Sequence, residues 1–194
     1  MSLLLLARAA VNHRTSSSVK WNPGDKDGTV TLSLGNTAAN FSTADRNVRG
    51  TVGRSTGLYY FRVKTSAGAT AASCAGVANA SASLSVRPGL SDANSWAHQS
   101  NGYQLHSGFA AYGYTWDAAN DELMVAVNFT SGNMWFGKNG TWMASGNPVT
   151  GANPAFTGVS GTLFPIGCSP SPAVVGGTTL TFVYDTPPSG FTYW

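Results

Sequence analysis

The sequence predicts an all-β fold in which two antiparallel sheets pack face to face as a sandwich. Short runs rich in β-branched and aromatic residues recur along the chain, separated by Gly, Asn and Pro, and this pattern is typical of strands and turns. The segment MWFGKNGTW at 134–142 places an Asn-Gly pair between two apolar arms, as a two-residue β-hairpin requires. No segment sustains the apolar period of an amphipathic helix.

The strands follow from these runs in chain order. The stretch VTLSL alternates apolar and polar residues, LYYFRVK is rich in aromatic and β-branched residues, and LMVAVNF is apolar enough for a buried central strand. The expected strands are 30–34, 58–64, 74–78, 103–105, 123–129, 134–138, 164–168 and 179–184, with a long loop from 79 to 96. The expected core includes Tyr60, Val77, Val125, Val127, Trp135 and Phe136.

Composition indicates one domain with an uncharged polar surface. A chain of 194 residues is the usual size of a single β domain, and only 10% of it is charged. Residues 1–87 carry ten basic and three acidic residues, whereas residues 88–194 carry one basic and five acidic residues. Either the two halves interleave in one sandwich, or a basic face docks on an acidic partner. No basic run or known motif favours nucleic acid as a partner.

The two cysteines and the N-terminal residues give no sign of export or of a membrane span. Cys74 and Cys168 each lie in an apolar run, where two buried free thiols are the expected state. The apolar run of Leu3–Leu6 is shorter than a signal-peptide core of roughly 7–15 residues or a membrane helix of about 20.

The chain resembles SPRY domains of the kind found in bacteriophage genomes. The hairpin is nearly identical to the "WF-x-KNGTW" hairpin of that family, and the other similar segments occur in the family's order. They are WNPGDKDGTVTLS (21–33), VRGTVGRSTGLYYFRV (48–63), AGVANASASLSVRPGLSDANSW (75–96), NPAFTGVSGTLFP (153–165) and PPSGFTYW (187–194). The resemblance implies a concanavalin A-like sandwich over residues 20–194 and a binding module. The family often has acidic residues after the central strand, and this chain has NFTSG there.

The patterns that could indicate catalysis lack the right context. The segment GRSTG at 53–57 matches GxSxG, but it precedes a strand, whereas a nucleophile elbow follows a strand and opens a helix. The only glutamate, Glu122, is adjacent to Asp121, and successive strand residues face opposite sides, which does not suit a glycosidase acid pair. His13, His98 and His106 have no metal-ligand spacing. We therefore expect no enzyme activity, metal or cofactor.

The best candidates for ligand binding are the aromatic residues around the loops at 85–120, because in SPRY domains the loops at one edge of the sandwich form the ligand surface. Rings can stack on a ligand while amides and charges orient it. Alternatively, these rings cover the ends of the sandwich. The predicted ligand-binding residues are Arg87, Asp92, Asn94, Trp96, Tyr112, Tyr114 and Trp116, with Tyr103 in the same aromatic cluster.

The predicted function is that of a non-enzymatic structural or accessory protein of a phage virion, on the capsid or the tail. Its partners would be other virion proteins or copies of itself, and assembly would take place in the host cytoplasm. The alternative is an adhesin that binds a glycan on the host surface. Residues 1–19 precede the first family motif and are predicted to be an arm that makes an assembly contact through Leu3, Leu4, Leu5, Leu6, Arg8 and Arg14.

Overall fold

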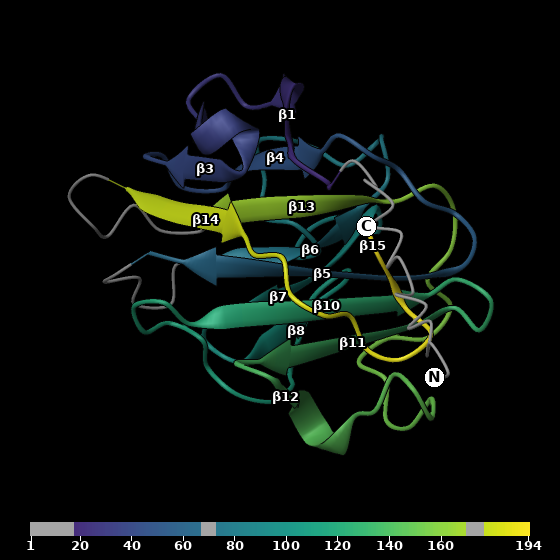
Figure 1. The fold of residues 1–194 in the computed structure, drawn as a ribbon. Coiled ribbons are helices and arrows are strands. Elements are labelled where there is room, and N and C mark those ends of the chain that lie inside the picture. The colour runs from purple at the N-terminus through teal and green to yellow at the C-terminus, as the bar shows by residue number, and fades with distance from the viewer. Residues whose placement is uncertain (1–17, 67–72, 170–176) are drawn as a thin grey trace, which may run out of the picture.

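The computed structural model describes residues 18–66, 73–169 and 177–194, which form two antiparallel sheets. In Figure 1 the eight-stranded sheet lies toward the viewer and the seven-stranded sheet lies behind it. The predicted fold class, an antiparallel two-sheet sandwich, is confirmed. Both sheets contain strands from both halves of the chain, so the basic and acidic halves interleave.

The seven-stranded sheet has the order β1-β4-β13-β6-β7-β8-β9, and β9 is one of its two edges. Its strands are β1 (Trp21–Lys26), β4 (Arg46–Gly50), β6 (Cys74–Ala78), β7 (Ser95–Gln99), β8 (Tyr103–Leu105), β9 (Phe109–Ala111) and β13 (Phe164–Ser169).

The eight-stranded sheet has the order β12-β11-β10-β5-β14-β3-β2, and β15 pairs with β5 in parallel. Its strands are β2 (Thr31–Ser33), β3 (Ala38–Phe41), β5 (Leu58–Thr65), β10 (Glu122–Asn128), β11 (Asn133–Lys138), β12 (Thr141–Trp142), β14 (Thr178–Phe182) and β15 (Thr192–Tyr193). Two short 3-10 turns, η1 (Leu34–Asn36) and η2 (Met143–Ser145), complete the described elements.

The predicted hairpin joins β11 to β12. Asn139 and Gly140 have φ values of 49° and 90°, and the flanking Lys138 and Thr141 are paired. Positive φ at both central residues is the requirement of a type I′ turn, which Asn-Gly meets at little steric cost.

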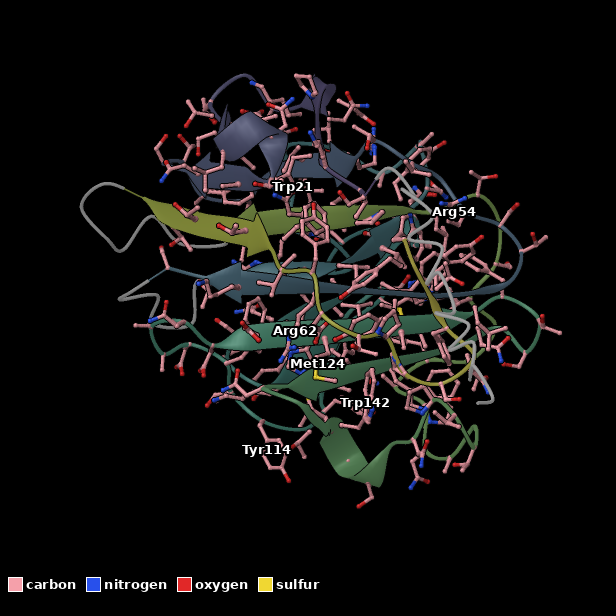
Figure 2. The ribbon with its side chains drawn as sticks, viewed as in Figure 1. Trp21, Arg54, Arg62, Tyr114, Met124 and Trp142 are labelled. Carbon is pink, nitrogen blue, oxygen red and sulfur yellow. The ribbon has the colours of Figure 1, made fainter. Side chains whose placement is uncertain are left out.

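The apolar residues form more than one cluster. Val77, Val125, Val127 and Phe136 lie between the two sheets, as predicted. Tyr60 and Trp135 are also buried, but they point to the opposite face of the eight-stranded sheet, where they form a second cluster with Met124, Ala126 and Phe191. Strand alternation is the reason, because neighbouring residues on β5 and β11 face opposite sides. Met124 and Trp142 are seen on this outer face in Figure 2.

Six strands were not predicted, namely β1, β3, β4, β7, β9 and β15. The expected loop at 79–96 ends where β7 begins, at Ser95. The residues of β7 include buried Ser95, His98 and Gln99, and such polar residues do not give the apolar pattern of a buried strand. β9 is short and exposed, so it lacks the alternating pattern as well.

Leu3 to Leu6, Arg8 and Arg14 lie outside the described residues, so the assembly contact of the arm stays a prediction. Val19, at the end of the predicted arm, is buried against the sandwich core. In the part of the chain that the structure describes, no helix is long and apolar enough to span a membrane. Cys74 and Cys168 are buried free thiols, as expected. They lie opposite each other in the register of β6 and β13. Burial raises the pKa of Cys74 to about 12 and that of Cys168 well above its usual value.

Candidate functional site

Of the seven predicted ligand-binding residues, the two tryptophans belong to the interior. Trp96 lies on β7 and stacks on His106, with a centroid separation of 4.5 Å and an interplanar angle of 11°. Trp116 is fully buried, and its indole N–H donates to Nδ1 of His98 at 3.0 Å. The sequence could not separate loop rings that face water from rings that close the end of the sandwich. The alternative structural interpretation holds for these two residues, because neither ring offers a free face to a ligand.

Two further predicted residues hold the loop before β7. Asp92 Oδ1 accepts hydrogen bonds from the backbone N–H of Asn94 at 3.0 Å and from the Ser95 hydroxyl at 2.8 Å. The Asn94 side-chain oxygen accepts a hydrogen bond from the amide of Asn79 at 3.0 Å. These bonds fix the loop in place, and they occupy acceptor atoms that a ligand would otherwise use.

Tyr112 and His98 are joined by a hydrogen bond between the imidazole and a backbone carbonyl. Nε2 of His98 is 2.7 Å from the backbone carbonyl of Tyr112. The Tyr112 hydroxyl is 3.4 Å from the carbonyl oxygens of Met143 and Asn153. Burial raises the pKa of Tyr112 to about 12. It also lowers the pKa of His98 to about 4, so this imidazole is neutral near pH 7.

Tyr114 and Arg87 remain as predicted residues with atoms available to a ligand. The Tyr114 side chain is exposed and points away from the body of the molecule in Figure 2. The Arg87 guanidinium donates to Asp45 at 3.0 Å and to Gln99 at 3.3 Å, and it borders a hollow on the outer face of the seven-stranded sheet. The two residues do not share that hollow, so the seven predicted residues do not form one site.

The hollow beside Arg87 has a volume of about 300 Å³, and we call it the first hollow. It is lined by Arg87, Leu90, Gln99, Asn101, Tyr103, Leu105 and Phe109. Tyr103 and Phe109 are 36% and 70% exposed, and their rings meet edge to face at a centroid distance of 5.4 Å. The first hollow therefore combines exposed aromatic surface with a cation and amides.

A second hollow of about 220 Å³ lies on the other face of β8 and β9, and it is lined by Gln104, His106, Ser107, Gly108, Phe109, Ala110 and Phe156. Asn101 and Gln104 each have a side-chain oxygen, Oδ1 and Oε1 respectively, that is buried and has no hydrogen-bond partner among the described residues. Protein atoms cover both oxygens, so they are not part of the exposed lining of either hollow.

The 79–94 loop forms one wall of the first hollow, because it is fixed against β8 at Gly89. The Gly89 φ is 72°, and a Cβ atom there would lie 2.2 Å from the carbonyl oxygen of Leu105. The Gly89 N–H donates to the Ser95 hydroxyl at 2.7 Å, and its carbonyl accepts from Gly108 at 3.2 Å. Only glycine allows this approach, so the loop, β7 and the β8–β9 turn form one unit.

The two acidic residues weighed for catalysis form ion pairs, and Ser55 lies in a loop. Ser55 is exposed in the loop before β5, where no helix follows it. Glu122 pairs with Arg62 at 2.7 Å, whereas Asp121 pairs with Lys138 at 2.9 Å. Burial alone would raise the pKa of Asp121, but hydrogen bonds from Lys138, Asn139 and a backbone N–H outweigh it and hold that pKa below its usual value. Within the described residues, no group of three or more His, Cys, Asp or Glu side chains could hold a metal ion.

Sequence reasoning missed Leu90, Gln99, Asn101, Gln104, Leu105 and Phe109 as residues of these hollows. A signal was present in YQLHSGF at 103–109, where aromatic residues flank a Ser-Gly turn. The turn predicts a hairpin, but the chain does not show that this hairpin lies at the edge of a sheet.

The structure is similar to known SPRY domains. The SPRY domain of human HERC1 aligns with a TM-score of 0.66 at 15% identity, covering 84% of this chain and 96% of that one. The PSpry domain of TRIM65 aligns with a TM-score of 0.64 at 14% identity, covering 87% of this chain and 93% of that one. Stonustoxin aligns with a TM-score of 0.60 at 16% identity, covering 86% of this chain but only 27% of the toxin chain. No family model and no curated protein matches the sequence. At these identities the likeness establishes the SPRY fold.

Proposed function

We propose that this chain is a non-catalytic protein-binding module whose contact surface is the β8–β9 end of the seven-stranded sheet. The SPRY fold supports a binding role, since the similar solved structures are SPRY domains and SPRY domains are mostly binding modules. The observation that carries the location is the exposed Tyr103–Phe109 pair over the first hollow. Exposed aromatic residues beside an Arg are typical of the residues that dominate protein interfaces.

Site-specific photo-crosslinking tests this location. Benzoylphenylalanine in place of Phe109 is compared with the same residue in place of Leu34. The two side chains are 70% and 72% exposed, and Leu34 lies in η1, next to β2 of the other sheet. We expect a protein adduct from position 109 in the cells or particles that hold the chain, and none from position 34. Equal adducts at both positions, or none at position 109, would refute the proposed surface.

The narrower role that we propose is structural or accessory, in a phage virion on the capsid or the tail. Its support is the sequence resemblance to phage SPRY domains, together with a surface that has few charges. Mass spectrometry of purified particles tests it. Deletion of residues 2–12 tests the proposed arm contact, because the shortened chain should fold but no longer join the particle. Normal incorporation of the shortened chain would refute that contact.

Glycan binding is the second candidate, because one observation favours it. Tyr103 and Phe109 expose ring surface on which a sugar ring would stack, and the first hollow is also lined by the amide residues Gln99 and Asn101. A glycan array with the wild-type chain and with Tyr103→Ala separates this role from protein binding. Binding to a defined glycan that is lost in the variant would favour the adhesin.

The proposal also expects no hydrolysis of polysaccharides or esters. Ser55 lies in a loop between two strands rather than in a strand-to-helix elbow, and Glu122 is paired with Arg62. Turnover that is abolished by Ser55→Ala or Glu122→Gln would overturn the non-catalytic role. The measurement is product release, with each variant compared at equal folded concentration.

A further inference from the structure

β9 is the last strand of its sheet, and its three residues are exposed. The ladder with β8 is fixed at one end by the Tyr112 N–H, which donates to the Gly102 carbonyl at 2.8 Å. At the other end the His106 N–H donates to the Gly108 carbonyl at 3.2 Å. Bonded and non-bonded pairs alternate along an antiparallel ladder. These two bonds therefore determine which residue pairs of β8 and β9 are hydrogen-bonded and which are not.

Within that pattern, Ala110 is the residue of β9 that bonds to Gln104 on β8. The backbone N–H and C=O groups of Phe109 and Ala111 consequently point away from the sheet. Among the described residues, no backbone hydrogen bond is made to these outward groups. The edge can therefore accept another strand.

The edge also lacks the side chains that usually prevent strand addition. Residues 99–116 contain no Lys, Arg, Asp, Glu or Pro. Natural edge strands are commonly protected by charges, prolines or a covering segment. β9 is short, but it has neither charge nor proline to repel an incoming strand.

The two hollows lie over β8 and β9, on either face of the edge hairpin. Tyr103 and Leu105 line the first hollow, Gln104 and Ala110 line the second, and Phe109 borders both. Successive residues of a strand face opposite sides, so the hollows lie on opposite faces of the same edge. Consecutive side chains of an added strand would therefore lie beside Phe109 at the rim of the first hollow and beside Ala110 at the rim of the second. Pockets for alternate side chains are the means by which strand addition achieves specificity.

Resting on the proposed protein-binding function, we propose that the partner binds as an extended, uncharged segment that adds a strand to β9. An apolar side chain of this segment packs on the Phe109 ring at the rim of the first hollow. Its neighbour lies beside Ala110 at the rim of the second hollow. A second copy of the chain fits less well, because β9 itself would present only Ala110 to the second hollow.

A display library of random peptides tests this binding mode. Peptides of about eight residues suffice, because a strand rises roughly 3.3 Å per residue. Enriched peptides should be uncharged and should carry apolar residues at every second position. Ala111→Pro removes only an outward N–H and should weaken their binding about tenfold, the effect of one lost hydrogen bond. Ala111→Ser keeps that N–H and should leave the affinity unchanged. N-methylation of every second peptide amide should abolish binding when the methylated amides face β9. It should have no effect when the methylated amides are those that face away from β9.

The outcomes separate this inference from the proposed function. Peptides that lose affinity with Phe109→Ser but bind Ala111→Pro normally would retain the surface and overturn strand addition. Peptides that bind Phe109→Ser normally would place the contact elsewhere and overturn both proposals. A library without an enriched pattern would also overturn the inference. So would a wild-type dimer in sedimentation that Ala111→Pro dissociates, because a second copy would then be the occupant.

Discussion

The buried imidazole of His98 should make stability depend on pH in a range where few other groups titrate. Its Nδ1 accepts the indole N–H of Trp116 at 3.0 Å, so the ring proton lies on Nε2, which donates to the Tyr112 carbonyl at 2.7 Å. A second proton would have to be placed on Nδ1, opposite the indole N–H. Protonation therefore breaks a buried hydrogen bond and also places a charge inside the sandwich.

The magnitude follows from linkage between protonation and folding. Burial lowers the His98 pKa from 6.5 to about 4, and the bond to the Tyr112 carbonyl opposes this only in part. The unfolded chain binds a proton below pH 6.5, whereas the folded chain does so only near pH 4. The stability is therefore fully present above the unfolded pKa and is lost as the pH falls toward the folded value. Between pH 7.5 and pH 5 the loss should be about 2 kcal/mol.

Urea denaturation followed by tryptophan fluorescence measures this loss. His98→Gln keeps a donor and an acceptor but cannot titrate, so its free energy of unfolding should change little between the same two pH values. His106→Gln is the matched control and should retain the wild-type loss. Asp27 and Asp121 have lowered pKa values and stay ionised in this range. An equal loss in His98→Gln, or no loss in the wild type, would refute this account of the buried imidazole.

Three further changes should alter the free energy of unfolding. Trp135→Ala should cost about 3–5 kcal/mol in urea denaturation, because the ring is fully buried; a cost below about 1 kcal/mol would contradict its place in the second cluster. Arg62→Ala should cost about 2 kcal/mol, because the largely buried guanidinium pairs with both Glu122 and Asp185; equal stability of the Glu122→Gln and wild-type chains would argue against this network. Leu34→Gly should stabilise by up to about 1 kcal/mol in thermal denaturation, since Leu34 has a φ of 51° and is 72% exposed; destabilisation would show that its side chain makes a needed contact.

The hairpin and the strongest strands follow from the sequence alone. The Asn139-Gly140 turn could be predicted because its conformation depends on two adjacent residues. β5, β6, β8, β10 and β11 were located to within about a residue, since their apolar runs are local signals. The SPRY-type sandwich followed from the order of these segments. These features need no knowledge of which residues meet in space.

Tertiary structure alone decided which side chains are buried and which are available to a ligand. Trp96 and Trp116 resemble Tyr114 in the sequence, but the first two fill the interior and only Tyr114 is exposed. The burial of Trp135 on the outer face of its sheet also depends on the C-terminal segment, which packs in the same cluster. The candidate site arises because β9 ends a sheet and the 79–94 loop closes over β8. Edges and hollows come from contacts between segments distant in the chain, so no local pattern of residues can determine them.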